Sequence, residues 1–192
     1  LGTATELRHL WQAPFTLHPN VVAGILAEAE TARAGGKGRI VAKMNSLLDP
    51  EVINALYEAS QAGVSIDLIV RGVCALRPGV PGLSDNIRVR SIIGRFLEHH
   101  RIFYFYAGGK ENVYLSSADW MERNFFKRIE LAFPILDPKL KKRVITEGLK
   151  FYLADNQQGW DMNGAGAYQR RRSARAKPHN AQGELMITLG GG

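Results

Sequence analysis

Cysteine is almost absent from this sequence, since Cys74 is the single one among 192 residues. A chain with one cysteine cannot form an internal disulfide, and such usage is typical of a reducing compartment. No run approaches the ~18 apolar residues of a membrane-spanning helix, and the opening LGTATELRHLW lacks the basic start and apolar block of a signal peptide. We therefore expect a cytoplasmic protein without a membrane span, and association with a membrane surface stays open. An initiator methionine is also missing, so we expect a piece of a longer chain.

Several catalytic motifs are missing as well. The sequence has no G-x-x-x-x-G-K-[ST] loop, and its two Gly-Gly-Lys runs read as turns, so ATP is not held by a Walker loop. It has no G-x-S-x-G elbow and no cluster of Cys and His with zinc spacing. Positive charge is abundant, since 25 Lys and Arg against 18 Asp and Glu give a formal net charge of +7. This excess favours an anionic partner and leaves nucleic acid, a phosphorylated metabolite, another polyanion and a membrane surface open.

The first third of the chain alternates between helical and strand patterns. Segment 18–38 has apolar residues at helical spacing until two glycines end it, and segment 49–63 opens with an Asp-Pro pair that suits a helix start. Segments 38–45 and 64–72 read as short buried strands. A strand, a helix and a strand with short connections imply parallel pairing.

The rest of the sequence completes an α/β fold. We expect a loop at 77–86, strands at 87–93, two within 101–119 and one at 128–136, and a long helix at 137–155. This order predicts an α/β sandwich with a mixed sheet flanked by helices within residues 1–155. From 156 to 192 the composition shifts to Gly, Gln, Ala and Arg, with dense positive charge at 168–177, and we expect a basic, mostly irregular tail.

Three stretches carry a family signature. They are KMNSLLDPEVINALYEASQAGVSIDLIVRGVCALRPGVPGLSDNIRVRSIIGRFLEHHRIFYF, VYLSSADWMERN and RIELAFPILDPKLKKRV. Together they resemble the C-terminal catalytic region of bacterial polyphosphate kinase, and the likeness runs from about Leu10 to about Arg172. The resemblance implies a phosphotransferase that reversibly moves the terminal phosphate of ATP onto a polyphosphate chain.

The resemblance also implies the second of two phospholipase D-like domains. Phospholipase D enzymes use a His-x-Lys pair on a strand and a later Gly-Ser-x-Asn turn. Here His99-x-Arg101 stands in the place of the first, and Ser116 to Asp119 stand near the second. Both departures argue against diester hydrolysis. The family's phosphorylated histidine and the arginines that hold magnesium lie upstream, so Mg²⁺ is expected as a cofactor held mainly outside this chain, and no metal ligand is assigned here.

Residues 95–105, RFLEHHRIFYF, place two imidazoles before an apolar strand. Strand alternation puts His99 and Arg101 on one face and His100 on the other, and an imidazole beside a guanidinium suits a phosphate. By pattern alone, such a histidine is more often structural or a surface residue. The resemblance favours function, because His99 in the FLEH motif matches the family's second essential histidine, whereas it assigns no role to His100.

Three further residues lie at strand ends. Arg71 ends the strand SIDLIV, where ligands of open α/β sheets bind, and the resemblance implies contact with an ATP phosphate. The alternative is a surface salt bridge. Lys43 and Asn45 end the preceding strand on one face. We expect Lys43 to hold a phosphate as a point charge and Asn45 to orient His99 or a phosphate oxygen, with plain strand-end polar residues as the alternative.

Other charged residues surround these candidates. Four arginines lie around the proline-rich loop, namely Arg77, Arg88, Arg90 and Arg95. We expect several to line a polyphosphate path, with a solvated basic face as the alternative. Asp119 and Glu130 flank the second motif and are expected to orient His99 or Arg101, or to form salt bridges. Glu98 is expected to point away from His99 and to be structural.

These patterns predict part of an ATP–polyphosphate phosphotransferase. Its expected partners are ATP or ADP, inorganic polyphosphate and the upstream domains of the same polypeptide, in a homo-oligomeric full-length protein. The γ-phosphate would pass to an upstream histidine and then to the chain end, with His99 as general acid/base or transition-state stabiliser and Arg71 neutralising phosphate charge. The fragment alone is expected to be inactive.

Two alternatives stay open. A nucleic-acid-binding module is favoured by the net charge and the basic tail, but the aromatic residues of FYFY read as core and not as a stacking platform. A phosphodiesterase of the phospholipase D type is the other, and the missing lysine of the His-x-Lys pair argues against it.

Overall fold

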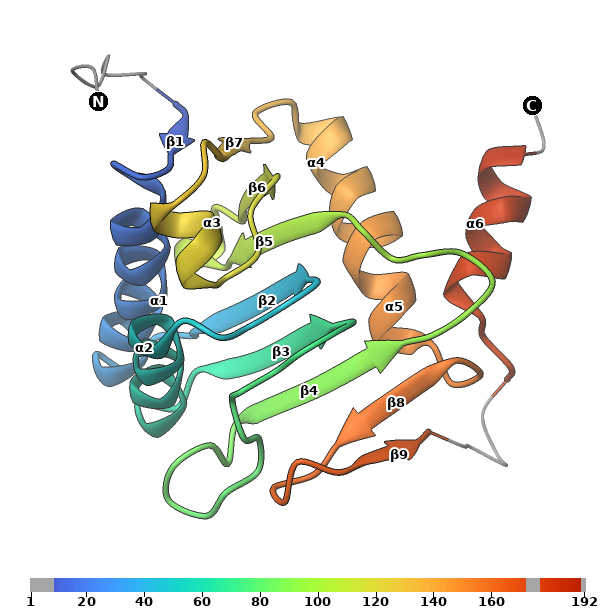
Figure 1. Ribbon diagram of the computed structural model, residues 1–192, viewed down its shortest axis with the longest axis horizontal. Coiled ribbons are helices and arrows are strands. Elements are labelled where there is room, and N and C mark those ends of the chain that lie inside the picture. Colours follow the sequence, from blue (N-terminus) through green and yellow to red (C-terminus); the bar gives the residue numbers. More distant parts are fainter. Residues whose placement is uncertain (1–8, 172–176, 191–192) are drawn as a thin grey trace.

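One mixed sheet forms the centre of the molecule (Figure 1). The computed structural model describes residues 9–171 and 177–190. The strands are β1 (Trp11–Gln12), β2 (Arg39–Met44), β3 (Ser65–Val70), β4 (Ile87–Ile92), β5 (Arg101–Phe105), β6 (Asn112–Ser116), β7 (Leu131–Pro134), β8 (Gly159–Met162) and β9 (Tyr168–Arg170). Their order across the sheet is β1-β7-β6-β5-β2-β3-β4-β8-β9.

Helices cover both faces of this sheet. They are α1 (Leu17–Arg33), α2 (Pro50–Gln61), α3 (Glu122–Phe126), α4 (Pro138–Ile145), a π-helical turn η2 (Thr146–Lys150), α5 (Phe151–Ala154) and α6 (Ala181–Gly190), with a 3₁₀ turn η1 (Ala107–Gly109) before β6. Helices α1 and α2 pack on one face, and the helix that runs from α4 to α5 packs on the other (Figure 1). The predicted α/β sandwich with a mixed sheet flanked by helices is confirmed.

The three central strands are parallel. Ile66 of β3 pairs with Ile40 of β2 and with Ile87 of β4, and the predicted strand–helix–strand unit is therefore confirmed. On either side the pairing turns antiparallel, from β5 to β2 and from β8 to β4. Met44 and Val70, the last residues of β2 and β3, are paired. The residues that follow β2 and β3 therefore lie close together at one edge of the sheet.

Local sequence accounts for the two Asp-Pro helix starts. The Asp49 carboxylate accepts the Val52 N–H at 3.0 Å, and the Asp137 carboxylate accepts the Leu140 N–H at 2.8 Å. Each bond satisfies a backbone donor that has no partner within the helix. Gly63, with φ of 96°, lies just beyond α2, where a side chain would be strained. These caps fix where β3 begins and where α4 starts to cover the sheet.

Alternation along β2 gives each helical layer its own core. Ala42 and Met44 belong to the apolar cluster under α1 and α2, whereas Val41 belongs to the cluster under α4 and α5. Lys43 follows the same alternation as Val41 and is directed toward α5. This single step of the pleat determines the environment of a predicted site residue.

The segment after residue 155 differs from its prediction. β8 pairs with β4, β9 pairs with β8, and α6 lies against α5, so a mostly irregular tail was wrong for the part of the chain that the structure describes. The composition of this segment did not indicate regular structure, because edge strands and a half-exposed helix need few apolar residues. Residues 172–176 of the basic run lie outside the described residues. None of the helices in the described ranges combines the length and apolar character that crossing a membrane requires.

Candidate active site

Two polar residues come together where β2 and β3 end. Asn45 follows β2 and Arg71 follows β3, and the Arg71 N–H donates to the Met44 carbonyl at 3.2 Å. The Arg71 guanidinium donates to the side-chain oxygen of Asn45. Its Nε is buried and has no hydrogen-bond partner among the described residues. Arg71 therefore keeps donor capacity beyond its contact with Asn45.

Asp119 links these strand ends to β5. Its carboxylate accepts the Asn45 backbone N–H at 2.6 Å and accepts Nε and Nη2 of Arg101 at 3.0 and 3.1 Å. The side chains of Arg101 and Asp119 are only 12% and 6% exposed. A two-point pair of this kind fixes the plane of the guanidinium. The expected salt bridge of Asp119 is present, and its partner is Arg101.

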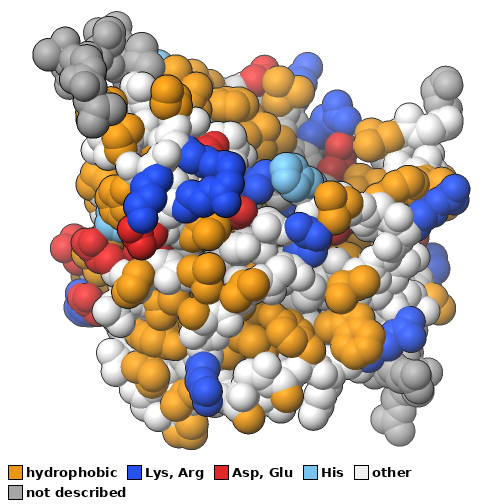
Figure 2. All heavy atoms as spheres, in the orientation of Figure 1, with side chains coloured by type: hydrophobic (Ala, Val, Ile, Leu, Met, Phe, Trp, Pro, Cys, Tyr) orange, Lys and Arg blue, Asp and Glu red, His pale blue; other side chains and the backbone are white. Residues whose placement is uncertain are grey.

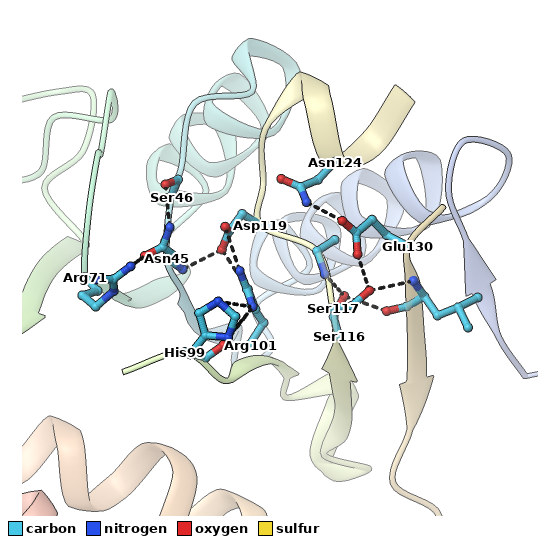
Figure 3. A network of polar contacts seen from close by, with 12 residues as sticks. Asn45, Ser46, Arg71, His99, Arg101, Ser116, Ser117, Asp119, Asn124 and Glu130 are labelled. Carbon is cyan, nitrogen blue, oxygen red and sulfur yellow. Dashed lines mark hydrogen bonds and ion pairs between the residues drawn. The ribbon is translucent and has the colours of Figure 1, made fainter. Parts of the chain in front are cut away.

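Arg101 in turn contacts His99. Its Nη1 donates to the His99 carbonyl at 2.9 Å and lies 3.3 and 3.4 Å from the two ring nitrogens. His99 itself is exposed, so a ligand can reach its ring. Arg71, Asn45, Asp119, Arg101 and His99 thus form one chain of polar contacts, which we call the edge network (Figure 3).

The edge network combines groups that suit phosphate chemistry. Its two guanidinium groups carry fixed positive charge and planar donors that match phosphate oxygens. An accessible imidazole can give or take a proton near neutral pH. Figure 2 shows Lys and Arg side chains gathered beside a histidine on the same face of the molecule. The surface is also hollowed beside Arg71, over about 210 Å³ between Ser91, Ile93, Trp160 and Tyr168.

Lys43 does not join the edge network, contrary to the prediction. Its Nζ contacts Glu98, lies 2.6 Å from Nε2 of His100 and lies 3.6 Å from the centre of the Tyr152 ring. The side chain is 2% exposed. The reason is strand alternation, which directs Lys43 toward α5, whereas Asn45 lies beyond the end of β2 and escapes that alternation. We call Lys43, Glu98, His100 and Tyr152 the Lys43 cluster.

Burial and mutual contacts shift the pKa values of all four members of the Lys43 cluster, and that of Tyr152 is raised by burial and by the charge of Glu98. Burial lowers the pKa of Lys43 to about 8, although Glu98 opposes the shift. Burial and then the charge of Lys43 lower the pKa of His100 to about 4. Burial alone would raise the pKa of Glu98, but the Lys43 ammonium outweighs it and the pKa lies below its usual range. Near neutral pH the cluster holds a charged Lys43–Glu98 pair beside a neutral imidazole that accepts from the ammonium.

The contacts of His99 and His100 confirm that the two imidazoles face different surroundings. His99 lies with Arg101 and His100 lies with Lys43, although β5 begins only at Arg101. The sequence assigned no role to His100, yet in the structure its ring contacts the buried ammonium of Lys43, although the side chain of His100 is itself 40% exposed. A signal was available, because period-two alternation from Arg101 predicts that His100 faces the other side of the sheet. Glu98 contacts Lys43 and Gln182, in agreement with the expectation that it points away from His99.

The other acidic residue of the second motif serves a different turn. Glu130 accepts from the Ser117 hydroxyl and from the Asn124 side-chain amide, the latter at 2.6 Å (Figure 3). Its hydrogen bonds in the described chain do not include His99 or Arg101. Glu130 therefore joins the end of β6 to α3 and leaves the orientation of Arg101 to Asp119.

The four arginines around the loop take different positions. Arg90 is buried, and its guanidinium pairs with Asp161 at 3.0 Å and donates to backbone carbonyls of α5. Arg88 pairs with Asp67 at 2.9 Å at the surface. Arg77 and Arg95 are exposed. Arg90 therefore fastens α5 to the sheet and does not line a solvent path, which leaves the exposed arginines as candidates.

A magnesium ion does not fit the donors of the edge network. Within residues 9–171 and 177–190 there is no group of three or more His, Cys, Asp or Glu side chains that could hold a metal ion. The carboxylate of Asp119 already accepts from Arg101 and from the Asn45 N–H. Magnesium prefers carboxylate and water oxygens in an octahedral arrangement. The expectation that Mg²⁺ is held mainly by residues outside this chain stays a prediction.

Comparison with known families decides the relationship. The family model described as polyphosphate kinase C-terminal domain 2 matches residues 10–182. The chain belongs to the polyphosphate kinase family. It is 66% identical over 186 residues to the polyphosphate kinases of Paraburkholderia phytofirmans and of Burkholderia cenocepacia. Each match covers 97% of this chain and 27% of the relative, so the chain spans about a quarter of the length of these relatives.

Solved structures agree with this relationship. Polyphosphate kinase from Porphyromonas gingivalis superposes with a TM-score of 0.94 at 40% identity, over 99% of this chain and 29% of that one. The phospholipase D family member Nuc from Salmonella typhimurium superposes with a TM-score of 0.57 at 16% identity, over 80% of this chain and 96% of that one. The second likeness concerns the fold alone. The phospholipase D-like fold that the resemblance implied is therefore confirmed.

Proposed function

We propose that this chain is the second phospholipase D-like domain of an ATP–polyphosphate phosphotransferase, and that the edge network binds the phosphates that are transferred. The observation that carries the proposal is the edge network itself, in which two arginines and an accessible histidine meet where parallel strands end. Relatives with 66% identity bear the name polyphosphate kinase, which supports the same substrates.

The proposed reaction has two reversible steps. In the first, the γ-phosphoryl group of ATP passes to a histidine nitrogen in an upstream domain, the bond to the bridging oxygen breaks, and ADP leaves. In the second, the terminal oxygen of a polyphosphate chain attacks that phosphorus and the phosphorus–nitrogen bond breaks. The phosphorylated histidine and the Mg²⁺ that neutralises phosphate charge are expected outside this chain.

The edge network supplies the remaining functions. Arg71 and Arg101 neutralise charge on the phosphates, with Asp119 holding the plane of Arg101. His99 acts as general acid/base or stabilises the transferring group, and its position beside Arg101 keeps it near the same phosphate. Asn45 orients Arg71 through its side-chain oxygen. ATP or ADP, polyphosphate and the upstream domains of the same polypeptide are the partners, in a cytoplasmic homo-oligomer.

The alternative functions have less support. The aromatic side chains of β5 that could stack on nucleic-acid bases are buried, with Phe103, Tyr104 and Phe105 each 7% exposed or less. In place of the lysine of a phosphodiesterase stands Arg101, which Asp119 holds at two points. Both observations favour phosphate binding without diester hydrolysis.

The division of labour between domains is tested by ATP turnover. The 192-residue chain alone is expected to form no ADP from ATP and polyphosphate, and the full-length protein is expected to do so. Turnover by the chain alone would overturn the two-domain mechanism. The phosphodiesterase alternative is tested by measuring product release from a phosphodiester substrate, and such release would support it.

The role of the edge network is tested by a matched pair of arginine variants in the full-length protein. Arg71→Ala is expected to lower polyphosphate synthesis by about 100-fold, because it removes a positive charge that neutralises the phosphates during transfer. Arg33→Ala removes an equal charge from an exposed surface pair on α1 and is expected to change the rate by less than about threefold. Equal losses in the two variants would contradict a specific role for the edge network.

A further inference from the structure

His99 lies on a connection that has no regular structure of its own. This connection, residues 93–100, joins β4 to β5, and most of its residues are exposed. Exposed connections are mobile unless buried contacts restrain them. A histidine that must meet a phosphate within hydrogen-bond distance needs such restraint.

Gln182 of α6 provides one restraint. Its Oε1 accepts the Phe96 N–H at 3.0 Å, and its Nε2 donates to the Phe96 carbonyl at 2.8 Å and to the Glu98 carboxylate at 2.7 Å. Gln182 is 5% exposed, so water competes little for these three bonds. One side chain of α6 thereby holds the backbone of the connection and the residue just before His99.

Helix α6 is itself fixed to the body of the fold. The buried carboxylate of Asp155 accepts the Ala181 N–H at 2.8 Å. The side chain of Asn156 donates to the Lys177 carbonyl and accepts the His179 N–H, each at 2.9 Å. Both residues follow α5 directly. Gln182 is therefore presented from a fixed support.

Lys43 provides the second restraint, on both sides of His99. Its ammonium contacts Glu98 and lies 2.6 Å from Nε2 of His100. The two neighbours of His99 thus bind the same buried group on β2, and His99 remains outside with Arg101. This arrangement fixes the backbone at His99 and leaves its ring accessible.

We propose that Gln182 and Lys43 are positioning residues for His99, which hold its connection from the buried side while the imidazole faces the substrate phosphates. The inference deepens the proposed function and rests on it for the identity of the substrate. The segment that looked irregular in the sequence therefore contributes a residue to the organisation of the edge network. Because the connection is already ordered before substrate binds, the loss of its conformational entropy does not add to the activation free energy.

The proposal is tested first by hydrogen exchange of the 192-residue chain, followed by mass spectrometry. Gln182→Leu keeps the side-chain volume and removes all three hydrogen bonds. Amides of residues 93–100 are expected to exchange about tenfold faster or more in this variant, while the central strands keep their protection. The matched control is Gln169→Leu, at an exposed position of β9, which is expected to leave residues 93–100 unchanged. Unchanged exchange in Gln182→Leu would overturn the proposal.

A second variant covers the case in which Gln182→Leu fails to fold. Gln182→Asn keeps the amide and shortens its reach, and the same local acceleration is expected. If neither variant accelerates exchange at residues 93–100 while folded, the restraint does not exist.

The kinetic test uses the full-length protein. Gln182→Leu is expected to lower kcat about tenfold and to change KM for ATP by less than about twofold, because substrate still binds Arg71. A merely structural role would reduce the folded fraction and leave kcat per folded molecule unchanged, which would contradict positioning. If wild-type protein makes no polyphosphate, the proposed function fails, and the exchange result still decides the restraint.

Discussion

His99 and His100 are neighbours in the chain and both are exposed, yet they contact different groups. His99 is exposed and contacts Arg101, which Asp119 holds in turn. His100 lies in the Lys43 cluster, where burial and the charge of Lys43 lower its pKa to about 4. An imidazole whose nitrogen is already bonded inside the fold contributes to stability, whereas one that keeps an open side can serve a ligand. The edge network and the Lys43 cluster differ in this respect, although the consecutive residues His99 and His100 belong one to each.

The sharpest way to break this comparison is to remove the ammonium of the Lys43 cluster. Lys43→Met is expected to lower the free energy of unfolding by about 3–5 kcal/mol, because it leaves the Glu98 carboxylate buried without its partner. Urea denaturation measures the loss. In Lys43→Met/Glu98→Gln the buried charge is gone, and most of the loss should be recovered. If Lys43→Met is as stable as the wild type, Lys43 and Glu98 do not act as a buried ion pair.

Removing a charge from the edge network should lower activity strongly. Asp119→Asn takes away half of the two-point contact with Arg101 and should lower polyphosphate synthesis by the full-length protein by about 10–100-fold. Steady-state kinetics measures the effect. The control is Asp85→Asn in the exposed loop, which should leave the rate within about twofold. A rate for Asp119→Asn equal to that of the control would remove Asp119 from the account.

Strand patterns predicted much of this fold and part of its site. The Asp-Pro starts of α2 and α4 and the alternating strands placed Arg71 and Asn45 at one sheet edge, because caps and alternation are local properties. The prediction extended the alternation past the end of β2 to Asn45, and it therefore placed the Lys43 ammonium on the wrong side of the sheet. Gln182 gave no signal, since its partners lie 84 and 86 residues away in the sequence. Contacts of that separation depend on the assembled fold.

A smaller effect is expected in the pH dependence of stability, to which His100 contributes through its lowered pKa. The unfolded imidazole of His100 binds a proton below its ordinary pKa of 6.5, whereas the folded one does so only below about 4. The unfolded state therefore binds more protons in this window, and stability must fall as the pH falls from 6.5 toward 4. His100→Asn should lose this part of the slope when urea midpoints are measured across the window. A slope unchanged in His100→Asn would show that His100 titrates normally.

The smallest effect is expected for an ion pair at the surface. Arg33 and Glu58 lie 2.6 Å apart with both side chains 49% exposed. Arg33→Ala should lower the free energy of unfolding by less than about 1 kcal/mol, and salt should weaken the pair further. Urea denaturation at low and high salt measures it. A loss as large as that of Lys43→Met would remove burial as the reason for the difference.

The most direct test compares His99→Asn with His100→Asn in the full-length protein, with polyphosphate synthesis and urea unfolding measured on both. For His99→Asn we predict a loss of activity of about 100-fold or more and an unchanged unfolding midpoint. For His100→Asn we predict a lower midpoint and a loss of activity of at most about tenfold. The reverse pattern, with activity lost at His100 and stability lost at His99, would contradict the account.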